Sequence, residues 1–288
     1  MTRQGATRED ERILRLESRT PADAPLVMMT AYDALSAQIA DECGVDFVLV
    51  GDSAATTVLG YENTRDVTID EMLMLTRAAR RGTTNALLVG DLPFGTYESS
   101  DDQALETAMR FRDAGCDMLK LEGGGRMRSR VQKLADAGMP MVGHVGLLPQ
   151  GAQSQADLKA RGRTAAEAVQ IVRDAIELEQ AGASLLVVEA VPAAVGAMIA
   201  TRVRIPVIGI GAGAEVDGQV LVYTDVLGLG AGHVPKFVRS YADARSVWTN
   251  ALSAYVRDVR AHAFPTAAET YGMSDDELKM FNAALAGD

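Results

Sequence analysis

The sequence has few cysteines and no long hydrophobic run. Its 288 residues include only Cys43 and Cys116, too few for a disulfide framework or a thiolate metal cluster. The longest apolar runs, such as 185–188 and 207–210, are interrupted by charge or glycine well before the roughly 20 residues of a transmembrane helix. The first 19 residues are rich in charge and lack the apolar segment of a secretory signal. We therefore expect a cytoplasmic protein without a membrane span.

Positive charge is also scarce. Lys and Arg together number 28 against 39 Asp and Glu, which gives a formal net charge of −11 at pH 7. Such an excess of negative charge, without a basic face, argues against a nucleic-acid partner. Hydrophobic residues make up 48% of the chain and charged residues 23%, values typical of globular domains rather than of disordered or fibrous proteins.

A recurring phrase organises the chain: an Ala- and charge-rich stretch, a glycine, and a short apolar run. Glycine at this place suits the left-handed residue that ends a helix. The apolar runs are unbroken and rich in Val and Leu, as in parallel strands that crossover helices bury on both faces. The phrase therefore predicts helix, turn and strand. Its four copies have glycines at 44, 115, 138 and 182, followed by the expected strands 47–50, 118–121, 141–142 and 185–188.

Four further apolar runs, at 26–29, 86–89, 207–210 and 234–238, bring the expected number of strands to eight. Eight βα units in about 250 residues are typical of a TIM barrel, whereas an open doubly wound sheet usually has fewer strands and a switch point. We expect an α/β fold with one (β/α)8 TIM-barrel domain over residues 1–288. It would comprise an N-terminal capping helix at about 7–18, the barrel at about 26–240 and C-terminal helices at about 241–285.

Charged side chains follow the expected strands at the end where TIM barrels carry their chemistry. So many carboxylates in one cleft are costly unless a cation or shared protons offset their repulsion. Capping of the next helix explains any one of these acids as well as a functional role does, but it does not explain the whole set. The set consists of Asp52, Asp91, Glu122 and Glu189, together with His144 and Lys120.

Oxygen ligands without thiolates favour a hard cation such as Mg²⁺, which keeps waters and accepts a substrate oxygen. Asp52, Asp91 and Glu122 leave three adjacent expected strands and are the best candidate ligands. Glu189 leaves a strand two positions away from that of Glu122, so it can face the other side of a bound molecule and act as a base.

A glycine-rich segment, Gly209 to Ala214, formally matches the dinucleotide pattern GxGxxA. It follows the expected seventh strand, and the acidic Glu215 and Asp217 come directly after it, so we interpret it as a tight turn near an adjoining loop. His233 and His262 lack metal-ligand spacing, and we expect no site at either.

Nine collinear segments resemble the signatures of the ketopantoate hydroxymethyltransferase (3-methyl-2-oxobutanoate hydroxymethyltransferase) family. The resemblance runs from about Met29 to Phe237, and a set of this length in order is highly specific. It implies membership of the phosphoenolpyruvate mutase and isocitrate lyase superfamily of barrels. The segments are Gly51-Asp52-Ser53, Arg81-Gly82, Asp91-Leu92-Pro93-Phe94, Lys120 to Gly124, Gly143 to Gly146 with Pro149-Gln150, Leu186 to Glu189 with Val191-Pro192, Ile208 to Gly213, Asp217-Gly218-Gln219 and Pro235-Lys236-Phe237.

The resemblance implies an activity and a set of residue roles. A hydroxymethyl group would pass from 5,10-methylenetetrahydrofolate to 3-methyl-2-oxobutanoate, with Mg²⁺ as cofactor, and give 2-dehydropantoate (ketopantoate) for pantothenate and coenzyme A biosynthesis. The family also implies a decameric homo-oligomer whose partners are a small 2-oxoacid and a folate. Carried over to matching positions, the metal site is Asp52, Asp91 and Glu122, the substrate contacts are Asp52, Ser53, Asp91, Lys120 and His144, and the catalytic base is Glu189.

Several segments depart from the family pattern. Ala54-Ala55-Thr56 replaces Leu-Gly-Met, Leu75 replaces a histidine, and Gln155 to Leu158 replaces a Gly-Gly-aromatic segment. Arg65-Asp66 replaces Leu-Pro, and Glu269 to Tyr271 lacks a customary histidine. The departures spare the metal, base and carboxylate contacts but fall where the alkyl end of the substrate, the lid or the folate is expected.

Two other classes of function stay open on the sequence alone. One is a Mg²⁺-dependent lyase, aldolase or hydroxymethyltransferase of the same superfamily that acts on a different 2-oxoacid. The other is a non-catalytic barrel, which the retention of all four strand-end acids disfavours.

Overall fold

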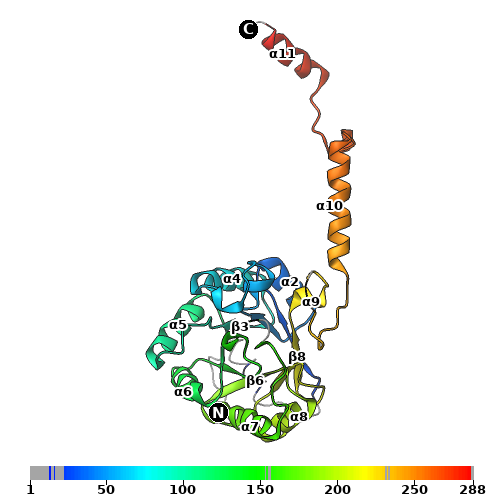
Figure 1. Cartoon of the computed structure of the whole chain (residues 1–288). Coiled ribbons are helices and arrows are strands. Elements are labelled where there is room, and N and C mark those ends of the chain that lie inside the picture. The colour runs from blue at the N-terminus through cyan, green and yellow to red at the C-terminus, as the bar shows by residue number, and fades with distance from the viewer. Residues whose placement is uncertain are drawn as a thin grey trace. The chain divides into compact units, whose positions relative to one another are not determined.

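Eight parallel strands form a closed barrel in the computed structural model, which describes Ile13, Leu16 and residues 23–286 except 153, 155, 156, 231 and 233. The strands follow one another around the barrel in chain order, and β1 closes onto β8 with Met28 opposite Val220 (Figure 1). The expected TIM barrel is confirmed. The strands are β1 Leu26–Thr30, β2 Phe47–Val50, β3 Leu87–Asp91, β4 Met118–Glu122, β5 Met141–Gly146, β6 Ala183–Glu189, β7 Val207–Ile210 and β8 Gly218–Leu221.

Seven of the strands lie where the apolar runs predicted them, but the prediction of the eighth at 234–238 was wrong. That segment contains a turn in which Val238 N donates to Pro235 O at 3.0 Å. The barrel is closed instead by the short β8. A Cβ on Gly218 would lie 2.4 Å from Leu26 O, so β8 approaches β1 at a position where only glycine fits.

Helices cover the outside of the barrel, and their starts carry local signals. Thr68 and Glu71 form a capping box at the start of α4, which satisfies two of the N–H groups that a helix start leaves free. The four glycines of the recurring phrase all have positive φ, between +76° and +102°. No helix in the described ranges is long and apolar enough to cross a membrane. The helices are α2 Ala34–Glu42, α3 Ala54–Thr57, α4 Ile69–Gly82, α5 Asp101–Asp113, α6 Arg128–Asp136, α7 Ala165–Gln180, α8 Ala193–Arg202 and α9 Tyr223–Val226, with 3₁₀ turns η1 Thr64–Asp66, η2 Gly125–Met127 and η3 Pro149–Gly151.

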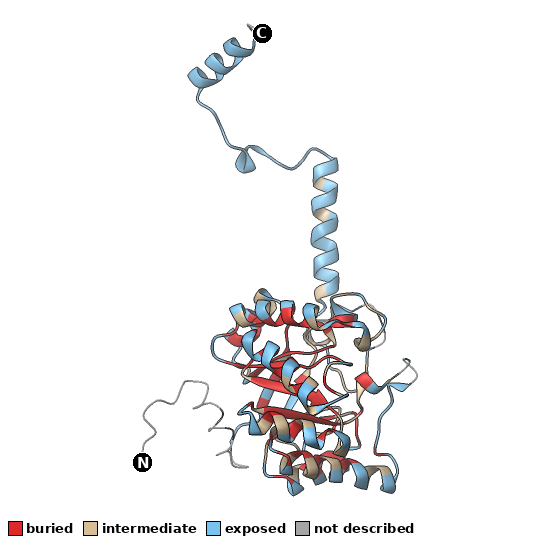
Figure 2. Ribbon diagram, turned by 90° about the vertical axis from the view of Figure 1, so that its left-hand side faces the viewer, coloured by how far each residue is buried: buried red, intermediate tan, exposed pale blue. Residues whose placement is uncertain are grey.

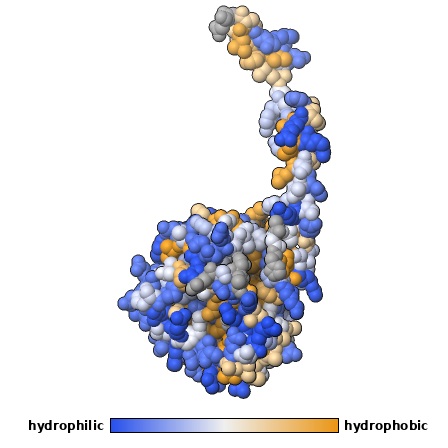
Figure 3. Space-filling model, in the orientation of Figure 1, coloured by the Kyte–Doolittle hydropathy of each residue, from blue (hydrophilic) through white to orange (hydrophobic). Residues whose placement is uncertain are grey.

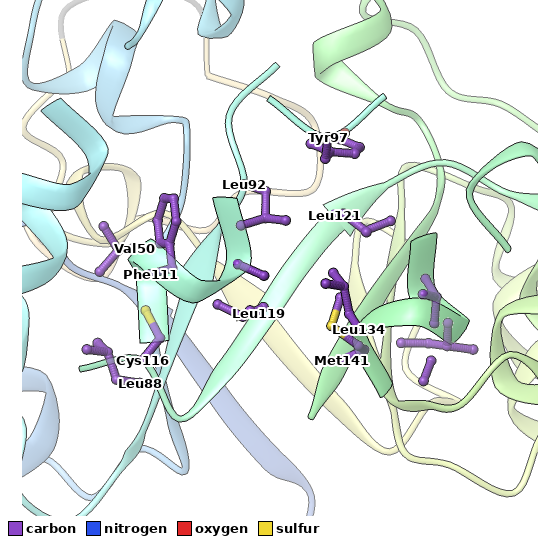
Figure 4. Close-up of a cluster of buried hydrophobic side chains, with 14 of the residues drawn as sticks. Val50, Leu88, Leu92, Tyr97, Phe111, Cys116, Leu119, Leu121, Leu134 and Met141 are labelled. Atoms are coloured by element: carbon purple, nitrogen blue, oxygen red, sulfur yellow. The ribbon is translucent and has the colours of Figure 1, made fainter. Parts of the chain in front are cut away.

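Two hydrophobic cores hold the barrel, one inside it and one between the strands and the helices (Figure 2). Figure 4 shows part of the outer core. Phe47 and Val89 belong to the inner core, and Phe111 to the outer one. Leu16 is buried in the inner core and Ile13 packs against it. These two helical residues fall within the expected N-terminal helix, whose other positions from 7 to 18 lie outside the described residues.

A second compact unit comprises Leu227–Leu229 and residues 241–288. Its helices α10 (Ala244–Arg260) and α11 (Asp275–Leu285), with the 3₁₀ turn η5 (Ala267–Glu269), lie in the range where C-terminal helices were expected. No described residue of α10 or α11 is buried, and apolar side chains such as Trp248 and Phe281 are exposed (Figures 2 and 3). That the whole chain acts as one domain stays a prediction.

Candidate active site

The register of the strands brings four charged residues together at the carboxyl end of the barrel. Asp91 of β3 lies opposite Lys120 of β4. Glu122, two residues after Lys120 on the same strand, lies opposite His144 of β5. Residues two apart on a strand point to the same face, so the pairs form adjacent layers. None of the four is more than 6% exposed. The grouping expected from the strand ends is therefore present.

Lys120 joins two of the acids. Its Nζ lies 2.7 and 2.8 Å from the two carboxylate oxygens of Asp91 and 3.8 Å from Oε1 of Glu122. Burial alone would lower the pKa of Lys120, but Asp91, Glu122 and Asp52 together raise it above its ordinary value. Burial, aided by Glu122, raises the pKa of Asp91 although Lys120 opposes this shift. Lys120 is therefore a fixed ammonium in a buried acidic cluster.

His144 lies between two carboxylates. Its Nδ1 is 3.3 Å from Oε1 of Glu122, and its Nε2 is 3.3 Å from Oε2 of Glu189. These are ion-pair contacts, because neither ring nitrogen has the alignment of a hydrogen bond within the described residues. Burial and Lys120 lower the pKa of His144, but the two carboxylates outweigh them and raise it to about 9. The two acids, one at each edge of the ring, therefore favour its protonated form.

Glu189 ends β6 and is the least buried of these acids, with 16% of its side chain exposed. The next residue, Ala190, has a φ of +49°, a left-handed conformation that costs a residue with a Cβ about 1 kcal/mol. Backbone hydrogen bonds from Ala190 N to Ile210 O and from Arg161 N to Ala190 O hold this turn. The chain therefore turns sharply directly after the candidate base.

Asp52 has an unmet acceptor. It follows β2, is 6% exposed, and its backbone N donates to Oδ2 of Asp91 at 3.1 Å. Its own Oδ2 is buried and has no hydrogen-bond partner among the described residues. Burial, with Asp91 and Glu122 nearby, raises the pKa of Asp52 well above its usual range. A charged Asp52 at this place needs a cation.

Ser53, an expected substrate contact, is held by a residue that sequence analysis did not identify. The hydroxyl oxygens of Ser53 and Tyr32 lie 2.7 Å apart. Tyr32 is fully buried, and its burial raises the pKa of the phenol to about 12. Its ring also contacts that of Tyr223, with centroids 5.5 Å apart.

Two further residues of the site, Tyr97 and Gln150, were not predicted. Gln150 N donates to Oε2 of Glu122 at 3.0 Å, and the Tyr97 hydroxyl lies 2.6 Å from Oε1 of Gln150. Both side chains are buried. Gln150 stood in one of the family segments, but an uncharged amide and a loop tyrosine give no strand-end charge signal.

The site fits a divalent cation that binds with the help of water. Four carboxylates face Lys120 and His144. With all four acids ionised the cluster would have an excess of two negative charges, which a bound cation would offset. Within the described ranges, no three acidic, cysteine or histidine residues converge to hold a metal by themselves. Mg²⁺ commonly uses one or two carboxylates and keeps several waters. The unpartnered Oδ2 of Asp52 meets that requirement.

The glycine-rich segment after β7 is a tight turn, as expected. Gly211 has a φ of +65°, and a Cβ there would lie 2.6 Å from the Phe237 ring. Of the departures from the family pattern, Ala54 and Ala55 are buried in α3, and Leu75 packs in the outer core. Residues 155 and 156, like His233, lie outside the described residues.

The closed parallel barrel with an acidic, lysine-bearing cluster at the carboxyl ends of its strands defines an enzyme of the (β/α)8-barrel class. Sequence comparison makes the assignment narrower. Residues 11–267 match the family model described as ketopantoate hydroxymethyltransferase. The chain belongs to this family.

Curated relatives agree with the family. A 3-methyl-2-oxobutanoate hydroxymethyltransferase from Geobacillus thermodenitrificans is 46% identical over 257 residues, which cover 89% of this chain and 92% of the relative. The protein of the same name from Oleidesulfovibrio alaskensis is 48% identical over 263 residues, 91% of each chain. A third, from Streptomyces avermitilis, is 48% identical over 83% of each chain.

Solved structures share the fold at low sequence identity. Phosphoenolpyruvate phosphomutase from Streptomyces platensis subsp. rosaceus matches with a TM-score of 0.59 at 14% identity, over 95% of each chain. A phosphonopyruvate hydrolase complex with oxalate and Mg²⁺ matches with a TM-score of 0.59 at 13% identity, over 96% of this chain and 97% of the other. The chain thus shares the barrel fold of these two proteins.

Proposed function

We propose that this enzyme transfers a hydroxymethyl group from 5,10-methylenetetrahydrofolate to 3-methyl-2-oxobutanoate and releases 2-dehydropantoate. The family match and the names of relatives that are 46–48% identical support the oxoacid and the product. The reaction consumes one molecule of water for each methylene group transferred. The methylene group provides the carbon of the new hydroxymethyl group, and water provides its oxygen. The product would enter pantothenate and coenzyme A biosynthesis.

Mg²⁺ is the proposed cofactor, and Asp52, Asp91 and Glu122 would hold it, some of them through water. The unpartnered Asp52 Oδ2 and the excess of negative charge support it, as does the Mg²⁺ in the phosphonopyruvate hydrolase complex, which has the same fold. When bound, the ion would polarise the 2-oxo group and stabilise the negative charge that develops on proton removal.

Side chains of the protein would remove the proton and bind the substrate. Glu189 would take the proton from C3 of the oxoacid, because it is the partly exposed carboxylate of the cluster, and His144 orients it from 3.3 Å. Lys120 would offset the negative charge of the substrate, and Ser53 would bind the substrate's carboxylate. The C3–H electron pair then forms the enolate, whose carbon makes the new bond to the methylene group of the folate. Both C–N bonds of that methylene group break, water supplies the new hydroxyl group, and the proton from C3 and one proton from water end on the two nitrogens of the released tetrahydrofolate.

One observation carries this assignment: a buried set of strand-end acids with an unpartnered oxygen on Asp52, in a chain of this family. The test is product formation from 3-methyl-2-oxobutanoate with and without 5,10-methylenetetrahydrofolate, and with EDTA in place of Mg²⁺. We expect 2-dehydropantoate only when both the folate and Mg²⁺ are present. Turnover of a different 2-oxoacid without folate would instead favour a lyase or aldolase of the same superfamily.

Cytoplasmic location and assembly as a homodecamer complete the proposal. The decamer rests on resemblance to the family, and the location on the sequence prediction given above.

A further inference from the structure

Two side chains replace a backbone hydrogen bond where β3 and β4 end. Leu92 N donates to Lys120 O at 2.9 Å. A parallel ladder would continue with a bond from Glu122 N to the Leu92 carbonyl. Instead, Glu122 N donates to the Tyr97 hydroxyl at 3.2 Å, and Leu92 O accepts a bond from Nε2 of Gln150 at 3.0 Å.

Tyr97 and Gln150 join these two ends. The Tyr97 hydroxyl has a single proton. We infer that it donates this proton to Oε1 of Gln150, because that contact, at 2.6 Å, is shorter than the 3.3 Å contact with Glu122 O. The Gln150 amide then has one orientation, with its oxygen toward Tyr97 and its nitrogen toward Leu92 O. Three hydrogen bonds in series thus replace one, and Figure 4 shows Tyr97 near Leu92 and Leu121 at the strand ends.

The same pair controls the side chain of Glu122. Gln150 N donates to Oε2 of Glu122 at 3.0 Å, which leaves Oε1 facing His144 and Lys120. Tyr97 is 1% exposed and Gln150 is 2% exposed, so bulk water offers little competition for these bonds. Both the backbone and the carboxylate of Glu122 are therefore held by two residues from loops after β3 and β5.

We propose that Tyr97 and Gln150 are positioning residues that set the place of the Glu122 carboxylate, and through it the strength of Mg²⁺ binding and the rate of proton removal. The inference rests on the proposed function and names residues that act through Glu122 rather than on the reacting atoms. Hydrogen-bond partners of metal-site ligands commonly change metal affinity by about 10- to 100-fold.

The test compares Tyr97→Phe, Gln150→Leu and the double variant in the full-length protein. Mg²⁺ dissociation constants come from calorimetry, and kcat and KM from product formation. The matched control is Thr107→Val: the Thr107 hydroxyl donates to Thr96 O at 2.6 Å in the Tyr97 loop, and its removal leaves the partners of Glu122 in place. The ring signals of His144, one of three histidines, provide an NMR readout that needs no metal.

Each single variant is expected to weaken Mg²⁺ binding about 10-fold, to lower kcat more than it raises KM, and to shift the His144 signals. The double variant should resemble either single one, because breaking any link opens the whole series. Thr107→Val should lower only the melting temperature. Folded Tyr97→Phe and Gln150→Leu with wild-type Mg²⁺ affinity, kcat and His144 signals would overturn the proposal.

The proposed function can fail independently of the positioning role. A wild-type protein that binds Mg²⁺ without converting 3-methyl-2-oxobutanoate contradicts the proposed function, while the Mg²⁺ affinities of the variants still decide the role of Tyr97 and Gln150. Unequal effects, with only one of the two variants changed, would contradict the series of bonds and thus the proposal.

Discussion

Lys120 Nζ lies within 2.8 Å of both carboxylate oxygens of Asp91, and the two residues are register partners on neighbouring strands of the barrel. The pairing fixes the ammonium between β3 and β4 with 4% of the lysine exposed. A buried ion pair of this kind is weak evidence for stability, because desolvation offsets much of the attraction. Its position at the strand ends agrees with the substrate-binding role that we propose for Lys120.

Removal of this ammonium should abolish most activity. We expect Lys120→Met to lower kcat about 100-fold or more, because the developing negative charge loses a fixed cation. Lys133→Met is the control, since the ion pair of Lys133 with Asp102 is exposed and 3.7 Å long. Steady-state kinetics on folded variants decide the matter, and equal losses in both would contradict a role for Lys120.

The buried charge of Asp52 should lower the free energy of unfolding when no metal is bound. Because the pKa of Asp52 is raised, the folded state binds its proton more tightly than the unfolded state does, and stability falls as pH rises above the unfolded value of about 4. Asp52→Asn should therefore raise the free energy of unfolding in EDTA at pH 7 by about 1 kcal/mol or more and remove stabilisation by Mg²⁺. Urea unfolding with EDTA or Mg²⁺ tests both effects, with exposed Asp276→Asn as control. A variant that is still stabilised by Mg²⁺ would argue against Asp52 as a ligand.

Asp41 should stabilise the barrel in a pH-dependent way. It is buried at the end of α2, and its carboxylate accepts bonds from Asn85 N at 2.8 Å and Ala86 N at 2.6 Å. Burial alone would raise the pKa of Asp41, but these bonds lower it. Its contribution is thus present above the unfolded pKa of about 4 and lost as pH falls through the lower folded value.

The substitution Asp41→Asn should cost about 1–3 kcal/mol at pH 7, since its amide would face the Asn85 amide instead of accepting from it. Below pH 4 the difference from wild type should shrink. Urea titrations across pH measure it, with the exposed Asp113→Asn as control. A difference independent of pH would show that the charge of Asp41 is not involved.

Gly146 should matter to Glu189 as well as to the fold. Its φ is +98°, and a Cβ would lie 2.3 Å from Glu189 O. Gly138 also has a positive φ, but a Cβ there meets nothing within 4 Å. Both Gly→Ala variants should lose about 1 kcal/mol from the left-handed backbone, whereas only Gly146→Ala should also slow catalysis, about tenfold or more, by displacing Glu189. Unfolding curves and kcat measured side by side separate the two costs.

Most strands of the barrel could be predicted, because the sequence signals for them are local. The glycine that ends a helix and the apolar run that follows it both lie within ten residues, as at Gly115 and β4. The eighth strand could not be found this way, because Gly218–Leu221 has only two apolar side chains and is defined by its closure onto β1, almost 200 residues away. The more apolar segment at 234–238 was a stronger but misleading local signal.

The charged part of the site could also be predicted, because strand ends in a barrel converge whatever the loops do. Asp52, Asp91, Lys120, Glu122 and His144 therefore followed from their places alone. Tyr32, Tyr97 and Gln150 did not, since their roles depend on loop paths and on hydrogen bonds between residues as far apart as 58 positions. The assignment of metal, substrate and base roles to individual residues stays a prediction.

The most direct test of the account follows loss of the C3 deuteron from labelled 3-methyl-2-oxobutanoate by NMR, with Mg²⁺ and without folate. The wild-type protein should exchange the deuteron in a Mg²⁺-dependent way, and Glu189→Gln should slow the exchange by at least about 100-fold while it keeps wild-type Mg²⁺ affinity. Exchange at the wild-type rate in Glu189→Gln would contradict proton removal by this strand-end carboxylate.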